Sequence, residues 1–206
     1  MSQTNGKSGK RRLDYELIHA LVPDGARVLD LGCGDGQLLA ELIRRKGCTG
    51  RGIEIDAQAA LACIQRGVPV YHGDMVEGMR FYRDHTFDVV ILSQTLQQAA
   101  DPPLVIQEML RVGETAIISF PNFGYWRVRL QLFLTGEMPV TPQLPYTWFD
   151  TPNVHLCTIA DFRRLCQDVG LARLREVFLA SPTRRIRGWG VNWRASLAIF
   201  QVRHGG

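Results

Sequence analysis

The sequence predicts an α/β fold in which helices cover both faces of a doubly wound, mostly parallel sheet of seven strands. Three observations predict it. Short apolar runs alternate with amphipathic helical patterns through about the first 120 residues. A glycine-rich turn separates the first apolar run from the helix that follows it. Nearer the end of the chain, one more helical pattern precedes two further strand patterns.

The elements follow one another in a regular order. Because a strand, a crossover helix and the next strand form a right-handed parallel unit, the first five strands are expected to be parallel. We predict strands at 26–31, 50–55, 68–71, 87–92, 115–120, 173–179 and 195–203. We predict helices at 14–22, 37–46, 57–66, 104–111 and 158–169.

The alternation of strands and helices stops at Pro121. The segment 121–155 is rich in proline and aromatic residues, and we interpret it as a lid or insertion within a single domain spanning 13–206. A helix is predicted around 126–134, where Gly136 would end it. An alternating strand pattern also fits these residues, so both interpretations stay open.

The net charge of +4 is concentrated at the N-terminus. Residues 1–12 contain four basic residues and no acidic one, which predicts a disordered basic tail. The rest of the chain is balanced, so nucleic-acid binding is not favoured. A basic loop containing Arg184, Arg185 and Arg187 has no assigned role.

Compartment and metal content follow from the cysteines and the apolar runs. The five cysteines include no CxxC pair, which favours separate reduced thiols and implies no metal site. No apolar run approaches the roughly 20 residues of a membrane span, and no signal-peptide core is found. We therefore expect a cytoplasmic protein without membrane contact.

The strongest local motif is VLDLGCGDG at 28–36. Its glycines let the backbone approach a ligand at the carboxyl edge of the sheet. Gln37 stands where a dinucleotide site needs its third glycine, and Asp30 would repel a pyrophosphate. An acidic residue here suits the ammonium and sulfonium groups of S-adenosylmethionine. A bare turn is the alternative. The assigned loop residues are Asp30, Gly32, Cys33, Gly34 and Gly36.

Two later strand ends complete the predicted nucleotide site. Glu54, about 20 residues after the loop, can accept both ribose hydroxyls, and the neighbouring Ile55 is assigned to the same site. A helix-dipole role for Glu54 is the alternative, and Asp56 is expected to cap the next helix.

The third and fourth strand ends supply the remaining candidates. Asp74 can accept from an adenine amine and Met75 can pack on the ring; a turn aspartate followed by a core methionine is the alternative. Ser93 follows the fourth strand, where the sheet opens towards the ligand, and is the least specific candidate.

In the glycine loop, Glu54 and Asp74, the chain resembles the class I methyltransferase superfamily, which has a Rossmann-like fold. The second half is more specific and is similar to the methionine-biosynthesis protein MetW family. The resemblance extends from about residue 13 to 203. It rests on FPNFGYWRVRL at 120–130, GEMPVT at 136–141, LPY at 144–146 and DTPNVHLCT at 150–158.

The resemblance implies a protein that binds S-adenosylmethionine or S-adenosylhomocysteine and acts with a homoserine O-acyltransferase of the MetX type. The segment 121–155 would then form the interface with that partner. The alternative is an active methyltransferase that acts on an unknown small molecule and uses the same segment as its lid.

The catalytic residues stay unknown, with His155 as the one candidate base. A structural role for His155 fits equally well. Tyr125, Trp126 and Tyr146 either line an acceptor pocket or form the core beneath the lid, and we prefer the core.

Overall fold

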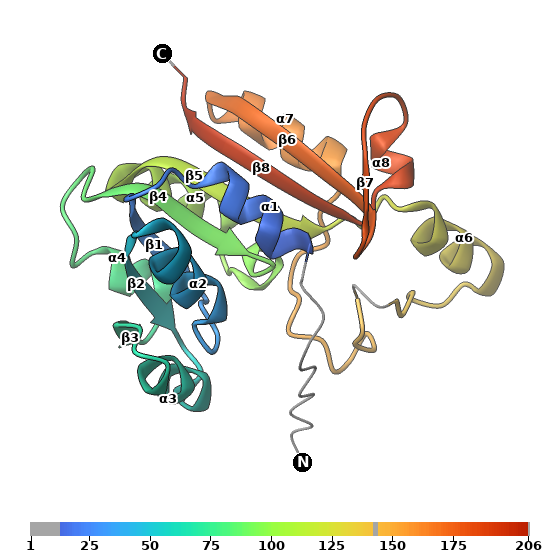
Figure 1. Ribbon diagram of the computed structural model, residues 1–206. Coiled ribbons are helices and arrows are strands. Elements are labelled where there is room, and N and C mark those ends of the chain that lie inside the picture. The colour runs from blue at the N-terminus through green and yellow to red at the C-terminus, as the bar shows by residue number, and fades with distance from the viewer. Residues whose placement is uncertain (1–12, 142–143, 206) are drawn as a thin grey trace.

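The computed structural model describes residues 13–141 and 144–205 (Figure 1). The predicted disordered tail at 1–12 lies outside these residues. The described part forms one mixed sheet with helices on both faces, so the predicted α/β, doubly wound fold is confirmed.

The sheet has eight strands in the order β3-β2-β1-β4-β5-β8-β6-β7. The first five strands are parallel, and β8, β6 and β7 join antiparallel. The eighth strand is the short edge strand β7, which occupies part of the predicted basic loop. The strands are β1 (Arg27–Leu31), β2 (Thr49–Glu54), β3 (Val70–His72), β4 (Phe87–Ser93), β5 (Gly113–Pro121), β6 (Leu171–Ser181), β7 (Arg184–Ile186) and β8 (Leu197–His204).

Helices pack on both faces of this sheet and form two apolar cores. The helices α1 (Leu13–Leu21), α2 (Gln37–Lys46) and α3 (Ala57–Gln65) contribute to one core. The other face carries α4 (Met75–Met79), the 3₁₀ helix η1 (Leu96–Gln98), α5 (Pro102–Val112), α7 (Ile159–Asp168) and α8 (Val191–Arg194). Burial on both faces explains the continuous apolar runs of β4 and β5.

The helix α6 (Trp126–Thr135) stands apart from these two layers (Figure 1). It confirms the predicted helix against the strand alternative, and Gly136 ends it with a φ of 67°. Val128 is its buried residue, so most of the helix contacts solvent. The helices α4 and α8 were not predicted, because helices of five and four residues show no readable periodicity.

Asn122 fixes the start of the insertion against the sheet. Its side chain is 1% exposed and donates to the carbonyls of Asn192 and Ala195, at 2.9 and 2.7 Å. Its Oδ1 accepts from the amides of Gly124 and Ile159. One buried amide therefore joins the end of β5 to α8 and to the first residue of α7.

Among the described residues, the longest apolar helical stretches fall short of what a membrane crossing would need.

Candidate functional site

The three glycines of the loop after β1 are favoured over larger residues for different structural reasons. All three have positive φ, at 63° for Gly32, 57° for Gly34 and 73° for Gly36. A Cβ at Gly32 would lie 2.9 Å from the side chain of Thr95, and one at Gly36 would lie 2.6 Å from Cys63 Sγ. A Cβ at Gly34 would meet nothing within 4 Å. The open side of the loop is therefore at Gly34, where a ligand could approach the backbone.

Glu54 connects the end of β2 to this loop. Its side chain is buried, and its Oε2 accepts from the amide of Gly34 at 2.7 Å. Its Oε1 accepts from the amide of Asp56 at 2.9 Å. A carboxylate has about four acceptor positions, so capacity for two ligand hydroxyls is left. Asp56 accepts from the amide of Ala59 and caps α3, as expected from the sequence.

Asp30 is a second buried carboxyl in the same place. It is 2% exposed, and its Oδ1 has no hydrogen-bond partner among the described residues. Burial raises its pKa to about 8, and the negative charge of Glu54 contributes to the shift. Two close carboxyl groups attract a cation or a strong hydrogen-bond donor.

Cys33 lies in the loop as predicted, and its thiol is packed against a second one. Its Sγ is 3.9 Å from Cys63 Sγ in α3. Burial raises the pKa of both thiols, so neither is prepared to act as a nucleophile. Cys33 therefore contributes packing behind the loop.

A cavity of about 530 Å³ opens in front of these residues. Five of the predicted site residues line it: Gly32, Glu54, Ile55, Asp74 and Met75. The other five, Asp30, Cys33, Gly34, Gly36 and Ser93, lie outside its lining.

Asp74 and Ser93 also have partners within the protein. Asp74 uses its Oδ1 to cap α4, accepting from the amides of Val76 and Glu77. Ser93 Oγ lies 3.3 Å from Ser119 Oγ. Asp74 thus has the structural role that was the alternative to ligand binding. Its Oδ2 has no hydrogen bond to a described residue and is available to a ligand.

The opposite wall of the cavity comes from residues that the sequence analysis did not single out. They follow β4, which lies directly beside β1 in the sheet and so brings its own carboxyl end to the glycine loop. Their position just after the carboxyl end of a parallel strand is the sequence signal that identifies them. They are Thr95, Gln98, Ala99, Ala100, Asp101, Leu104 and Val105.

His155 lies outside the lining of this cavity but contacts one of its lining residues. Its side chain is exposed, and its Nε2 is 3.4 Å from the carbonyl oxygen of Ala100, a lining residue. The amides of Val154 and His155 both donate to the carbonyl of Gln97 in η1. The end of the insertion is therefore attached to one cavity wall.

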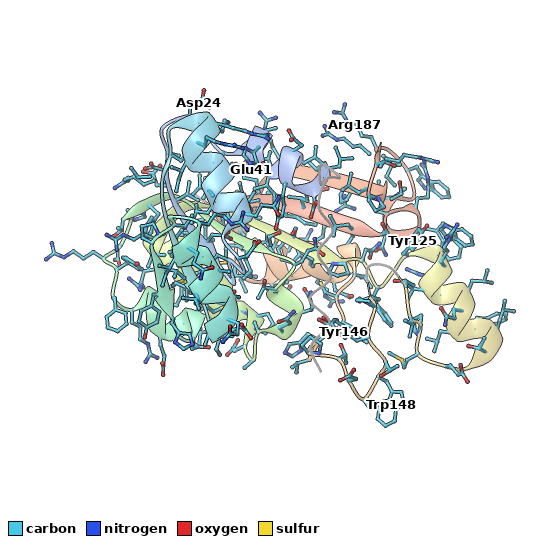
Figure 2. All side chains as sticks on the ribbon, turned by 60° about the horizontal axis from the view of Figure 1, so that its bottom comes forward. Asp24, Glu41, Tyr125, Tyr146, Trp148 and Arg187 are labelled. Carbon is cyan, nitrogen blue, oxygen red and sulfur yellow. The ribbon has the colours of Figure 1, made fainter. Side chains whose placement is uncertain are left out.

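The aromatic residues of the insertion do not form the core that we predicted. Tyr146 is 47% exposed, and Tyr125 and Trp126 are half-buried. Figure 2 shows Trp148 at the outer tip of the insertion. The preference for a core beneath a lid was wrong, because α6 and the following segment extend outward from the sheet instead of across it.

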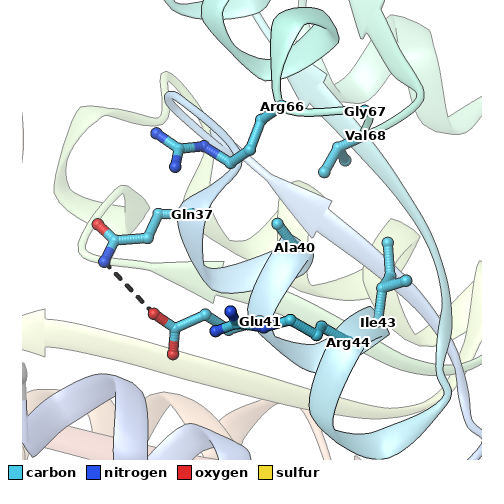
Figure 3. A pocket seen from close by; sticks show the side chains of 8 residues that line it. All are labelled: Gln37, Ala40, Glu41, Ile43, Arg44, Arg66, Gly67 and Val68. Atoms are coloured by element: carbon cyan, nitrogen blue, oxygen red, sulfur yellow. Dashed lines mark hydrogen bonds between the residues drawn. The ribbon is translucent and has the colours of Figure 1, made fainter.

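A second hollow, of about 430 Å³, lies between α2 and the turn after α3 (Figure 3). Gln37 and Glu41 are hydrogen-bonded to each other on its wall, and Arg66 pairs with Asp35. Arg44 lines it as well, and none of the predicted site residues does. Within 13–141 and 144–205, no cluster of three or more metal-ligating side chains occurs.

Comparisons with known proteins agree on family and fold. The family described as "Methionine biosynthesis protein MetW" matches residues 12–202. A bifunctional methionine biosynthesis protein MetXA/MetW of Rhodopirellula baltica is 39% identical over 175 residues, covering 81% of this chain and 28% of that protein. A ubiquinone biosynthesis O-methyltransferase of Xanthomonas campestris is 34% identical, covering 54% of this chain and 49% of that one. The chain thus spans half or less of the length of these relatives.

A solved structure supports the fold independently. A SAM-dependent methyltransferase of Thermotoga maritima superposes with a TM-score of 0.68 at 17% identity, covering 92% of this chain and 86% of that one. At this identity the similarity concerns the fold, which is that of S-adenosylmethionine-dependent methyltransferases.

Proposed function

Because the chain belongs to the MetW family of methionine-biosynthesis proteins, we propose that it binds S-adenosylmethionine or S-adenosylhomocysteine and acts with a homoserine O-acyltransferase of the MetX type. The observation that carries the binding proposal is the cavity that has Gly32 and Glu54 on one wall. The biosynthetic role also favours the cytoplasmic location expected from the sequence.

The cavity suits such a ligand in size and chemistry. Its volume of about 530 Å³ lies in the range of small-molecule pockets. Glu54 on the cavity wall has acceptor capacity left for the ribose hydroxyls, and the buried Asp30 lies behind that wall. Met75 with Leu104 and Val105 offers apolar surface for an adenine ring.

The partner proposal rests on the fused relative. Its name combines MetXA with MetW in one protein, and this chain matches 28% of its length. Fusion holds two components at a high effective concentration, which is useful when they act together. We propose that the segment 121–155, an insertion of a single domain over 13–206, contributes to the contact.

An active methyltransferase is the second candidate, and the position of His155 favours it. The imidazole Nε2 lies 3.4 Å from the carbonyl oxygen of the cavity-lining Ala100, which leaves Nδ1 to act as a general base toward an acceptor beside the cavity. Methyl transfer would then depend mainly on the orientation of acceptor and donor.

The binding proposal is tested by calorimetric titration of both nucleosides into the wild type and Glu54→Gln. We expect the variant to bind about tenfold or more weakly, from the loss of charge-assisted hydrogen bonds. Arg44→Gln, an exposed change on α2, is the control. Equal affinity of Glu54→Gln and the wild type would contradict the ribose assignment.

The partner proposal is tested with the purified MetX-type enzyme of the same organism. We expect a complex on gel filtration and a homoserine acylation rate that changes when the protein is added. Absence of both would contradict it. A parallel assay with radiolabelled S-adenosylmethionine and a methionine-pathway metabolite mixture would favour the second candidate if label is transferred.

A further inference from the structure

The helix α6 exposes apolar side chains that nothing among the described residues covers. Leu130 is 43% exposed, Phe133 84% and Leu134 68%. Val128 alone of this helix's residues is buried. A gathering of exposed apolar residues on a folded protein marks an interaction surface.

A second segment, distant in sequence, extends this surface. Trp189 is 95% exposed and Trp193 is 51% exposed, both next to or within α8. The guanidinium of Arg129 in α6 lies 5.4 Å from the centroid of the Trp193 ring. We call α6 together with residues 184–194 the arginine–tryptophan surface. Figure 2 shows Arg187 and Tyr125 toward the same end of the molecule, away from Asp24 and Glu41.

The charges of this surface have one sign. Neither 121–135 nor 182–196 contains an aspartate or glutamate. No arginine of the surface forms an ion pair with a described residue, and every one is exposed. These arginines are Arg127, Arg129, Arg184, Arg185, Arg187 and Arg194.

We propose that the arginine–tryptophan surface docks an acidic face of a partner protein. Tryptophan and arginine are the residues most enriched at the energetic centres of protein interfaces, and unpaired arginines call for carboxylates opposite them. Resting on the proposed function, the inference further identifies that partner as the homoserine O-acyltransferase. It also gives the unassigned loop at 184–187 a role in recognition.

Other occupants fit the surface less well. A second copy of the chain would bring the same positive charges together, and residues 1–12 carry positive charge as well. Phosphate backbones would leave Phe133 and Leu134 in water. An interfacial membrane helix segregates its apolar residues to one side, whereas Val128 and Phe133 lie on opposite sides of α6, one buried and one in solvent.

The test measures affinity for the purified MetX-type acyltransferase by biolayer interferometry, using full-length variants. Trp189→Ala should weaken binding about 30-fold, as a hot-spot truncation does. Arg184→Glu with Arg187→Glu should weaken it about 100-fold by placing like charges against acidic groups. The matched control is Arg44→Glu with Arg51→Glu, which reverses two exposed arginines at the other end of the sheet. It should stay within about threefold of the wild type.

The outcomes separate the two proposals. If the wild type does not bind the enzyme, the partner assignment of the proposed function fails, and this inference fails with it. If the wild type binds and both surface variants bind as the control does, only the surface is wrong. Tight binding of the wild type to duplex DNA or to phosphatidylserine vesicles, lost in the arginine variant, would overturn the choice of a protein as occupant. Unchanged circular dichroism and thermal unfolding confirm that each variant is folded.

Discussion

At the end of the sheet that contains β1 and β2, two arginines lie in ion pairs with acidic residues. The guanidinium of Arg27 lies 2.6 Å from Asp88 Oδ1, and that of Arg66 lies 2.5 Å from Asp35 Oδ2 in the glycine loop. At the end that contains β6 and β7, the arginines of the arginine–tryptophan surface have no acidic partner among the described residues, and Trp189 is almost fully exposed. The first end encloses a cavity of about 530 Å³, which suits a small ligand. The second exposes several arginines that have no acidic partner among the described residues, together with exposed tryptophans, which suits a macromolecule.

The largest expected effect comes from separating the insertion from the sheet. Asn122→Ala should lower the free energy of unfolding by about 3–5 kcal/mol, because it leaves two buried amides and two carbonyls without partners. Urea unfolding followed by circular dichroism measures this change. Asn153→Ala, in the same insertion but without a side-chain hydrogen bond to a described residue, is the control. Equal losses in the two variants would show that Asn122 does not fix the insertion.

The next effect concerns Asp30 and the pH. In the native state its pKa is about 8, against 3.8 for the ordinary group, so between these values the folded protein holds a proton that the unfolded chain has lost. Its stabilising contribution is fully present below about pH 4 and disappears as the pH rises through about 8, with a slope of at most about 1.4 kcal/mol per pH unit.

The Asp30→Asn variant isolates this contribution. We expect its free energy of unfolding to change less steeply than that of the wild type when urea titrations are repeated between pH 5 and pH 8. Other titrating groups are common to both proteins and cancel in the difference. If the free energies of unfolding of the two proteins changed equally with pH, Asp30 would be ionised at neutral pH and would have a charge partner within the protein.

A smaller effect is expected from valine substitutions at two glycines, which distinguish backbone strain from loss of ligand contact. Gly34 and Gly136 both have positive φ, and at neither would a Cβ meet an atom within 4 Å. Gly34→Val and Gly136→Val should therefore each lose about 1–2 kcal/mol of stability from the left-handed backbone. Only Gly34→Val should lose nucleoside binding in calorimetry. Normal binding by Gly34→Val would show that the loop is merely a turn.

The smallest effect sharpens the description of the exposed end. Trp189→Ala and Trp148→Ala remove side chains that are 95% and 74% exposed, so the free energy of unfolding should change by no more than about 0.5 kcal/mol. Thermal unfolding measures it, with Phe200→Ala as a buried aromatic that should be strongly destabilising. A loss above about 1 kcal/mol at either tryptophan would place it in the core.

Much of the fold was predictable because its signals are local. The bounds of α2 were predicted as 37–46, since apolar periodicity between Gly36 and Gly47 defines both ends. The capping role of Asp56 followed from its position alone. The short edge strand β7 was missed because three residues pair there through a hairpin, which leaves little pattern in the sequence.

The sequence by itself determined where most strands and helices lie along the chain, the glycine loop, and the position of Glu54 at a strand end. Periodicity and turn chemistry act between residues that are near neighbours in the chain, so these features can be predicted locally. The tertiary structure alone decided which distant segments meet. It placed the residues after β4 opposite the loop, buried Asp30 beside Glu54, and brought Arg129 against Trp193. These contacts depend on the strand order of the sheet and on where the insertion leaves it, and no local pattern encodes either.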